Sequence, residues 1–401
     1  MKVTIGSPKI IQNGDKYQLN TTIEFEQKSK ELFIEVDGTY ADYFDDEVVD
    51  GFIVAILPYC MMLAKKKKVV INSTAKISRR LRFQLERYYI PVVSKNISYF
   101  GSVELNIAET DKVHKKPFAV ATGVSGGVDS SYSIARNQKG TTQGLTHLVY
   151  ADLGIYRGFG SDAEKRLQAK CKGIADAVEL PMIVIRTNIC TELYKKAYAP
   201  VVHSVFAGLI LSMQKFFKTY YYSSTLSAEK FHFDEADAGD YELFTLPLLS
   251  TDSLTFYSSG MEATRLEKVK YIADKPFAQN NLFVCLNVNE DGSNCNRCAK
   301  CTRTMCELEI AGKLNNFDKV FDIEGFKADP AYHWGYALLK NWGGDPFYTE
   351  LIEEKKKQGL KIMMPIYKSA LKKFVSRGFT TANKKRENVW EQIILDYDEE
   401  N

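Results

Sequence analysis

Short runs in which hydrophobic and polar residues alternate fill the first 45 residues of the chain. Period-two alternation is typical of half-buried β-strands. We predict antiparallel strands at residues 3–5, 17–25 and 32–36, with Asn13-Gly14 as a hairpin turn between the first two. An apolar helix, a strand, an amphipathic helix and a strand are predicted next, at residues 46–64, 69–72, 76–89 and 102–107. Together these elements predict a small N-terminal α+β domain of residues 1–116.

From Pro117 onward, short apolar runs are separated by longer stretches with helical spacing. The predicted strands are at residues 118–123, 146–151, 181–187 and 219–225. The predicted helices follow the first strand and also cover residues 161–178, 200–218 and 262–273. Strands that alternate with helices favour an α/β fold, in which a parallel sheet carries helices on both faces. We assign residues 117–306 to this second domain.

After Cys306 the sequence shows no strand pattern. Residues 307–401 have the spacing of helices, and we expect a helical C-terminal region there. Its three tryptophans, Trp334, Trp342 and Trp390, are the expected packing anchors.

Composition limits the classes of protein to consider. The 401 residues are 45% hydrophobic and 26% charged, which is ordinary for a globular protein and excludes disorder over most of the length. A net charge of +3 gives no support to nucleic acid or membrane as a partner of the whole molecule. The longest apolar run, residues 52–64, contains Pro58 and is too short to span a bilayer. The N-terminus has no apolar signal region, so we expect a cytoplasmic protein.

The most specific motif reads Ser-Gly-Gly-Val-Asp-Ser-Ser and lies between a predicted strand and a predicted helix. Its glycines let backbone N–H groups approach an anion closely, and the following helix presents its positive end. The serine hydroxyls add neutral donors, whereas Asp129 would repel a phosphate and is expected to cap the helix or to hold Mg²⁺. The motif is not a Walker A loop. The predicted cofactor-binding residues of the loop are Ser125, Gly126, Gly127, Val128, Asp129, Ser130 and Ser131.

Five of the eight cysteines lie in one segment, which in a reducing compartment points to a metal rather than to disulfides. Four of them have the spacing Cys-x9-Cys-x2-Cys-x2-Cys, which fits a tetrahedral Zn²⁺ site; an iron–sulfur cluster and a site without metal are the alternatives. The fifth, Cys306, falls on the apolar side of the next helix and is expected to pack. The predicted ligands are Cys285, Cys295, Cys298 and Cys301.

The glycine-rich motif resembles the S-G-G-x-D-S signature of the PP-loop, or N-type ATP pyrophosphatase, superfamily. The cysteine spacing and the Arg303 that follows it narrow the resemblance. With these features added to the loop motif, the chain is similar to the 7-cyano-7-deazaguanine synthase branch of that superfamily. The resemblance covers residues 117–306 and implies a PP-loop (HUP-like) fold. It also implies a reaction in which ATP is cleaved between its α and β phosphates, an oxygen is adenylated and a nucleophile displaces AMP. In that branch a carboxylate is converted with ammonia through an amide to a nitrile.

The resemblance also suggests further site residues. Asp152 matches an acidic position after the second strand. Independently of the resemblance, Ser223, Ser224 and Thr225 close the fourth predicted strand, where ligands of parallel sheets sit, so Ser223 is expected to face the site. The family's Arg and Asn before the fourth strand are Val202 and His203 here, so the deazaguanine substrate is not carried over. His203 is a candidate for substrate contact or proton transfer; the alternative is a structural histidine.

Two cations complete the set of candidates. The family carries a lysine near the nucleotide phosphates, a role that Lys268 or Arg265 would take; both are alternatively solvated helix residues. The predicted catalytic residues are thus Asp129, Lys268, Arg265 and His203. Asp152 and Ser223 are predicted nucleotide contacts in addition to the loop.

We therefore predict an ATP-dependent adenylating enzyme that uses ATP, Mg²⁺ and Zn²⁺. It would join ammonia or another nitrogen nucleophile to a small-molecule or peptide substrate. One rival is a sulfurtransferase acting on a nucleoside or RNA, with Cys190 as the candidate thiol. The other is a nucleotide-binding protein with a protein or peptide partner, for example in a defence system. The N-terminal domain has no assigned role, and pairing of two copies through it to form a homodimer is one possibility.

The C-terminal region carries an excess of positive charge. Residues 351–390 contain eleven Lys and Arg against three Glu, interleaved with Tyr367, Phe374 and Phe379. Basic and aromatic residues in this mixture are consistent with an RNA-binding patch. Solvated helix faces are the alternative.

Overall fold

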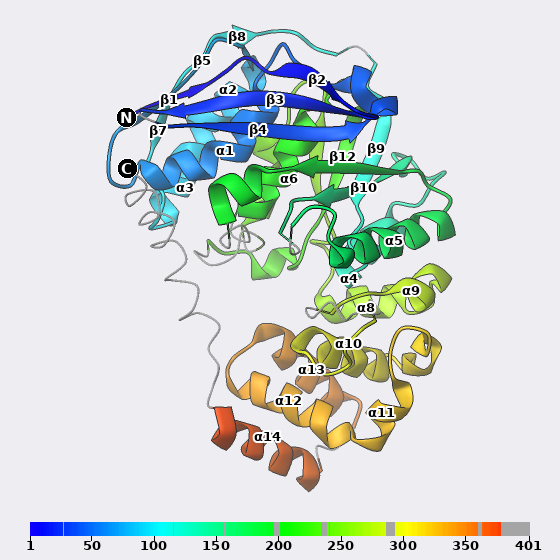
Figure 1. The fold of residues 1–401 in the computed structure, drawn as a ribbon. Coiled ribbons are helices and arrows are strands. Elements are labelled where there is room, and N and C mark those ends of the chain that lie inside the picture. Colours follow the sequence, from blue (N-terminus) through cyan, green and yellow to red (C-terminus); the bar gives the residue numbers. More distant parts are fainter. Residues whose placement is uncertain are drawn as a thin grey trace.

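The computed structural model describes most of the chain, and it divides into a large sheet with its helices and a helical region below it (Figure 1). The described residues are 1–26, 28–114, 116–155, 158–195, 201–233, 239, 241–285, 293–359 and 363–377. The predicted anchor Trp390 and the aromatic Phe379 lie outside them. Among the described residues, no helix is both long and apolar enough to cross a membrane.

Within the described residues, eleven strands form one sheet, in the order β13-β12-β9-β10-β11-β4-β3-β1-β5-β7, with β2 paired to β3. The strands of its first half are β1 (Lys2–Ile5), β2 (Lys9–Asn13), β3 (Lys16–Phe25), β4 (Lys28–Asp37), β5 (Val69–Ser73) and β7 (Val103–Asn106). Those of its second half are β9 (Ala119–Gly123), β10 (His147–Asp152), β11 (Met182–Thr187), β12 (Phe217–Ser223) and β13 (Thr255–Ser259). A separate two-stranded pair joins β6 (Ile77–Ser78) to β8 (Glu109–Thr110).

The sheet is mostly parallel. All neighbouring strands from β13 to β11 run parallel, as do β1–β5 and β5–β7. Antiparallel pairing joins β1 and β4 to β3, as predicted, and it also joins β2 to β3, where no strand is predicted. The two halves meet where β11 pairs antiparallel with β4, through Arg186 opposite Glu35 and Thr187 opposite Ile34. The N-terminal residues therefore extend the central sheet.

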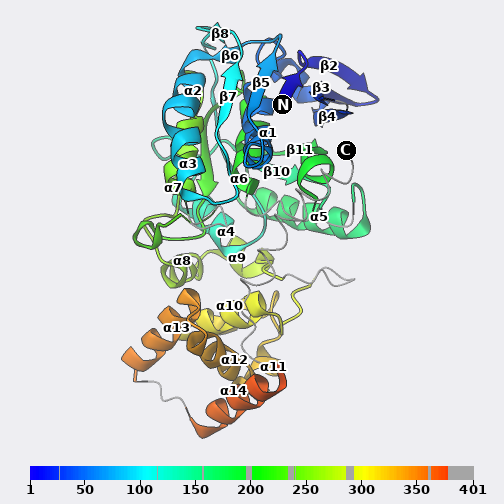
Figure 2. The same ribbon diagram turned by 90° about the vertical axis from the view of Figure 1, so that its left-hand side faces the viewer.

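Helices cover both faces of the central strands, which confirms an α/β architecture. Side chains alternate along β9: Ala119 and Ala121 belong to one hydrophobic cluster and Val120 to the other. The first cluster includes α1 (Asp50–Leu63) and α6 (Val202–Leu211), and the second includes α4 (Val128–Arg136), α5 (Asp162–Ala177) and α8 (Arg265–Ile272). Figure 2 shows this layering edge-on.

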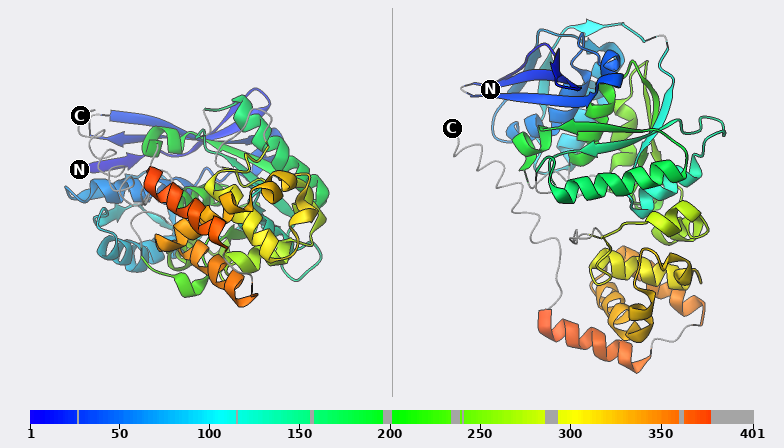
Figure 3. Two further views of the ribbon diagram at one scale, coloured as in Figure 1. Left: turned by 90° about the horizontal axis from the view of Figure 1, so that it is seen from below. Right: turned by 45° about the vertical axis from the view of Figure 1, so that its right-hand side comes forward.

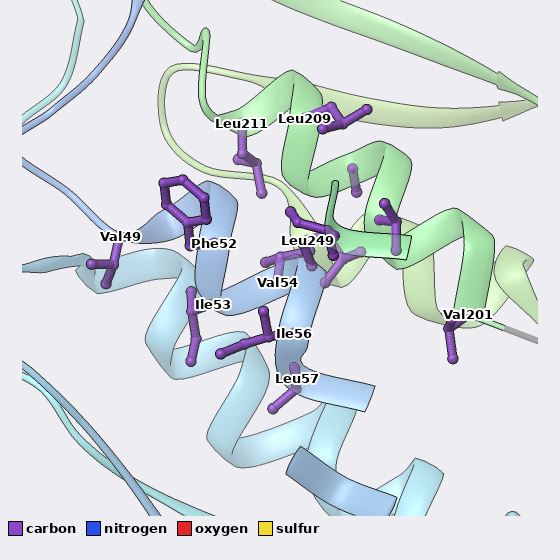
Figure 4. Packing of buried hydrophobic residues seen from close by; sticks show 14 of the residues in the cluster. Val49, Phe52, Ile53, Val54, Ile56, Leu57, Val201, Leu209, Leu211 and Leu249 are labelled. Carbon is purple, nitrogen blue, oxygen red and sulfur yellow. The ribbon is translucent and has the colours of Figure 1, made fainter. Parts of the chain in front are cut away.

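The contact between α1 and α6 joins the predicted N-terminal domain to the central one. The two helices pack side by side there, and Val54 of α1 and Leu211 of α6 are both buried in the same hydrophobic cluster (Figure 4). Gly51 and Gly208 allow the two backbones to approach, because a Cβ on Gly208 would lie 2.5 Å from the carbonyl oxygen of Gly51. One continuous core thus spans the predicted boundary at residue 116.

The region after the cysteine cluster is helical wherever it is described, as predicted. Its helices are α10 (Ala299–Ile310), α11 (Ile323–Ala328), α12 (Pro330–Trp342), α13 (Pro346–Lys357) and α14 (Met364–Arg377). Trp334 is 2% exposed and anchors this core, whereas Trp342 is 40% exposed. The remaining helices are α2 (Arg79–Gln84), α3 (Ile90–Asn96), α7 (Glu242–Thr245) and α9 (Pro276–Asn281).

Several elements differ from the sequence prediction. No strand is predicted at β2, β6, β8 or β13, and the predicted helix at 76–89 is α2 followed by a π-helical segment at Leu85–Tyr89. The run Thr255–Ser259 has little alternation, and it becomes a strand because β12 supplies a parallel partner along its whole length. Helix α8 starts at Arg265 because Thr264 and Glu267 form a capping box there.

Candidate functional site

The glycine-rich loop follows β9 and leads into α4, at the carboxyl end of a parallel strand, where α/β proteins bind ligands. Gly126 has φ = 76°, a conformation that favours glycine. A Cβ at this position would also lie 3.3 Å from the Cβ of Phe283. The Gly126 carbonyl accepts a 2.8 Å hydrogen bond from the Phe283 N–H. Residue 126 therefore allows both the turn and the contact with the segment before the cysteine cluster.

The serines of the loop hold its shape and leave hydroxyl groups near the helix start. Ser130 Oγ donates to the Gly127 carbonyl at 3.1 Å and lies 3.1 Å from Ser125 Oγ. Ser125 is exposed, whereas Ser131 is 1% exposed and its Oγ has no hydrogen-bond partner among the described residues. Backbone N–H groups at the start of α4, including that of Val128, belong to the positive end of the helix dipole.

Asp129 is the point where three of the predicted catalytic side chains meet. Arg265 Nη1 lies 3.1 Å from its Oδ2, and Lys268 Nζ lies 3.8 Å from its Oδ1. Lys268 is fully buried and donates to the Ser224 carbonyl at 2.7 Å. Burial lowers the pKa of Lys268, although the charge of Asp129 opposes the shift. The sequence analysis predicted either Lys268 or Arg265 near the loop, and in the structure both lie beside Asp129.

Helix α10 adds groups that the sequence analysis did not assign to the site. Glu307 is 1% exposed and lies 3.4 Å from Arg265 Nε and 3.6 Å from Arg303 Nε. Arg265 Nη2 also donates to Thr304 Oγ1 at 3.3 Å. Burial raises the pKa of Glu307, against the opposing effect of the two arginines. One sequence feature could have pointed to these residues. Polar side chains recur at spacings of three and four residues, which places them on one side of a helix: Lys300, Arg303, Thr304 and Glu307.

These contacts gather three basic side chains beside the loop. Arg265, Lys268 and Arg303 face the carboxyl groups of Asp129 and Glu307, and burial raises the pKa of Glu307 and lowers the pKa of Lys268. The guanidinium of Arg303 packs 4.4 Å from the ring centre of Phe347, which fixes its position. Guanidinium groups beside a glycine loop and a helix N-terminus suit a phosphate-bearing ligand.

Two predicted nucleotide contacts have other environments. Asp152 ends β10 but is 3% exposed: its Oδ2 accepts from Arg186 Nε at 2.8 Å and its Oδ1 from the Gly154 N–H at 3.1 Å. Its carboxylate therefore joins β10 to β11. Ser223 ends β12, half-buried, with its Oγ 3.5 Å from Thr122 Oγ1 on β9. Of the two, Ser223 remains beside the carboxyl end of β9.

His203 has the environment of a structural histidine, which corrects its assignment as a catalytic residue. It is 1% exposed, its Nε2 lies 3.0 Å from Thr245 Oγ1, and its ring meets Tyr241 edge-on at 5.7 Å. Burial lowers the pKa of His203 to about 3. A histidine that stays neutral over the physiological range and has no solvent access is a poor proton shuttle.

The four predicted metal ligands converge. Their sulfur atoms all lie within 4.8 Å of one another, with Cys285 Sγ 3.9 Å from Cys298 Sγ and Cys295 Sγ 4.0 Å from Cys301 Sγ. Four 2.3 Å bonds at tetrahedral angles place sulfurs about 3.8 Å apart. The set therefore fits a single tetrahedral ion. A multi-iron cluster distributes its cysteines over several irons and would hold the sulfurs further apart.

The cysteine cluster is coupled to the loop through the chain between them. Phe283 bonds to Gly126, the Val284 N–H donates to Asn294 Oδ1 at 3.0 Å, and Cys285 follows directly. On the other side, Cys298 is the N-cap of α10, the helix that carries Arg303 and Glu307. The cluster thus fixes both segments that border the cation site.

The other four cysteines are buried, which agrees with packing roles. Cys306 is fully buried, as predicted. Burial raises the pKa of the thiols of Cys60, Cys171 and Cys190 to about 12. Cys190 is therefore an enclosed neutral thiol, which disfavours it as a sulfur carrier.

Comparison with known proteins adds no assignment to these observations. No family model matches the chain, no curated protein matches it significantly, and no solved structure matches it significantly. The function is therefore inferred from the loop motif, the charges around it and the cysteine cluster.

Proposed function

We propose that the chain is an ATP-dependent adenylating enzyme of the PP-loop type, with a HUP-like catalytic domain. ATP would be cleaved between its α and β phosphates, an oxygen of a carboxylate or amide-like group would attack the α phosphorus, and pyrophosphate would leave. A nitrogen nucleophile such as ammonia would then displace AMP. The substrate would be a small molecule or a peptide. The substrate of the 7-cyano-7-deazaguanine synthases, which the motifs resemble, is not part of the proposal because Val202 and His203 replace the family's Arg and Asn.

The observation that carries the proposal is the meeting of the glycine loop with buried cations. The loop alone offers N–H groups and hydroxyls, which many anions would satisfy. Arg265 and Arg303 add guanidinium donors held by Glu307 beside Asp129. Such fixed charges supply the electrostatic stabilisation that a departing pyrophosphate requires, without rearrangement during the reaction.

Two metal ions belong to the proposal. Asp129 is the candidate for holding Mg²⁺, since carboxylates are its preferred protein ligands and the buried Oδ1 accepts no hydrogen bond from the described residues. Zn²⁺, held by Cys285, Cys295, Cys298 and Cys301, would stabilise the segments on either side of the site. With four protein ligands, this zinc has no open position for substrate, so its role is structural.

The rival functions differ in support. Sulfur transfer needs an accessible thiol, yet every cysteine outside the cluster is buried. A nucleotide-binding protein with a protein or peptide partner would use the same loop without turnover, so only the reaction products distinguish it from an enzyme.

The first experiment measures nucleotide chemistry directly. The purified protein is incubated with α-labelled ATP, Mg²⁺, ammonia and a panel of carboxylates, and AMP and pyrophosphate are quantified. Equal amounts of both products are expected. Binding of Mg·pyrophosphate by calorimetry gives a second measurement that needs no substrate.

Matched variants on α4 make the test specific. Ser130→Ala removes a loop hydroxyl, and we expect pyrophosphate binding to weaken at least tenfold. Ser133→Ala removes a buried hydroxyl that has no hydrogen-bond partner among the described residues, and should leave binding unchanged. Equal binding by both variants would refute the loop assignment, and binding without AMP formation would favour the non-enzymatic rival.

A further inference from the structure

Helix α14 presents an exposed apolar stripe to the outside of the molecule. Met364, Leu371 and Val375 are 65%, 53% and 84% exposed, and Tyr367 is 39% exposed. Their spacing of three, four and four residues puts them on one helix face. The opposite face, with Ile366 and Ala370 at 6% and 0% exposure, faces the helical core. Seen from below, α14 lies in front of the other helices (Figure 3).

The stripe continues onto a neighbouring helix. Trp342 at the end of α12 is 40% exposed, and its ring centre lies 6.4 Å from that of Tyr367. Single exposed apolar residues are ordinary on protein surfaces, but a contiguous patch of large side chains marks an interaction site. We call this surface the α14 stripe; it consists of Trp342, Met364, Tyr367, Leu371 and Val375.

The charge around the α14 stripe limits what covers it. Helix α14 contains four basic residues and no acidic one: Lys368, Lys372, Lys373 and Arg377. An occupant must therefore combine an apolar stripe of similar length with negative charge. A second copy of α14 would bring like charges together, which disfavours a symmetric pair.

The basic surface is smaller than the sequence suggested, which weakens the case for RNA. Lys355 is 7% exposed, with its ammonium 3.7 Å from the ring centre of Trp334. The basic run at 384–386 and Phe379 lie outside the described residues. The α14 stripe is also aliphatic at three of its five positions, whereas nucleic acid is bound by aromatic stacking and cations.

The chain's own C-terminal sequence has the required chemistry. Apolar residues recur with helical spacing at Val389, Trp390, Ile393, Ile394 and Tyr397. From residue 387 to the end there are six Asp and Glu and no Lys or Arg. Residues 378–388 separate this run from α14, and eleven residues reach at most about 36–40 Å. That is longer than the roughly 17 Å from Met364 to Val375 along a helix.

We propose that residues 387–397 dock on the α14 stripe of the same molecule, with their acidic residues beside the lysines of α14. If residues 389–397 form a helix on binding, it would be about 12 Å long and would fit within the roughly 17 Å of the stripe. The apolar contacts supply the affinity and the charges set the orientation. Covering the stripe removes a surface that would otherwise promote association.

Hydrogen exchange of the full-length protein, read by mass spectrometry on peptides from 364–377, tests the docking. Ile393→Glu places a charge on the apolar side of the tail, and we expect exchange in α14 to accelerate at least fivefold. Gln392→Glu adds the same charge on the other side of a helix and serves as the matched control, with a change below twofold. Leu371→Glu on α14 should accelerate exchange as Ile393→Glu does.

Each alternative occupant has its own outcome. Equal exchange in Ile393→Glu and Gln392→Glu would overturn the proposal. Protection that disappears on dilution, together with a dimer in sedimentation, would assign the cover to a second copy and also overturn it. Protection that appears only when a single-stranded RNA oligonucleotide is added would assign the stripe to nucleic acid, with the same consequence.

Discussion

At the scale of single residues, the position of a side chain relative to the glycine loop decides which candidates can act. Asp129, Arg265 and Lys268 are charged groups that the fold brings within ion-pair range of one another. Glu307 joins them although it lies 42 positions after Arg265 in the sequence. His203, whose residue type suggests proton transfer, is enclosed among Thr245, Ser204 and Tyr241 instead. Residue type alone therefore does not predict a role: Lys268 is as buried as His203, but it lies beside Asp129 of the loop, whereas His203 lies among Thr245, Ser204 and Tyr241.

The burial of His203 predicts an acid sensitivity of the fold. Its pKa is lowered to about 3 in the folded protein from 6.5, so below pH 6.5 the unfolded chain takes up a proton that the folded chain does not. Stability therefore falls as pH decreases, by up to about 1.4 kcal/mol per pH unit between roughly pH 6 and 4. The exposed fraction of 1% means that solvent screening is small.

His203→Gln should flatten this dependence by close to one proton, measured by urea unfolding at several pH values. Ser133→Ala provides the control: it removes a buried polar side chain that does not titrate in this range, so the slope should stay as in the unaltered protein. A slope that His203→Gln leaves unchanged would mean that His203 is protonated in the folded state.

At the scale of elements, the cysteine cluster connects the loop to the helix that carries the site's second arginine. On one side, the Phe283 N–H donates to the Gly126 carbonyl, and on the other side Cys298 occupies the N-cap position of α10. The ligands come from both segments, so one metal ion would hold both. Metal binding and the geometry of the cation site should therefore change together.

Removing one ligand tests this coupling. Cys298→Ser should lose tightly bound zinc, and amide exchange should rise in α10 and in the loop at 123–127 because their shared support is gone. Zinc content by mass spectrometry and hydrogen exchange are the measurements. Cys190→Ala alters a buried cysteine outside the cluster and should keep full zinc. Full zinc in Cys298→Ser would refute the ligand assignment.

At the scale of the whole molecule, one sheet unites the two predicted N-terminal and central domains. Two registered residue pairs join β4 to β11, and side-chain contacts add to them: Thr187 Oγ1 donates to the Phe33 carbonyl at 2.6 Å, and Arg186 forms ion pairs. Arg186 lies 2.8 Å from Asp152 and 3.2 Å from Glu35, two carboxylates whose side chains are 2% and 8% exposed. Removing the arginine would leave both charges buried without their counter-ion.

Arg186→Ala should therefore destabilise the protein by roughly 3 kcal/mol. Lys16→Ala, which removes a more exposed pair with Asp37 at 2.9 Å, should cost less than about 1 kcal/mol. Urea unfolding followed by circular dichroism measures both, and one cooperative transition is expected because the core is continuous. Two separate transitions would indicate that the N-terminal and central parts unfold independently.

The sequence by itself determined what is local: strands and helices with strong periodicity, the glycine loop from 125 to 131, and the cysteine spacing. These follow from backbone preferences and ligand geometry within a few residues. The tertiary structure alone decided which distant groups meet. Glu307 lies beside Arg265, Asp152 pairs with Arg186, and His203 is buried. The run Thr255–Ser259 forms a strand because it pairs with β12, and both halves of the chain belong to one sheet. Burial and charge pairing depend on packing between elements far apart in the chain, which periodicity does not encode.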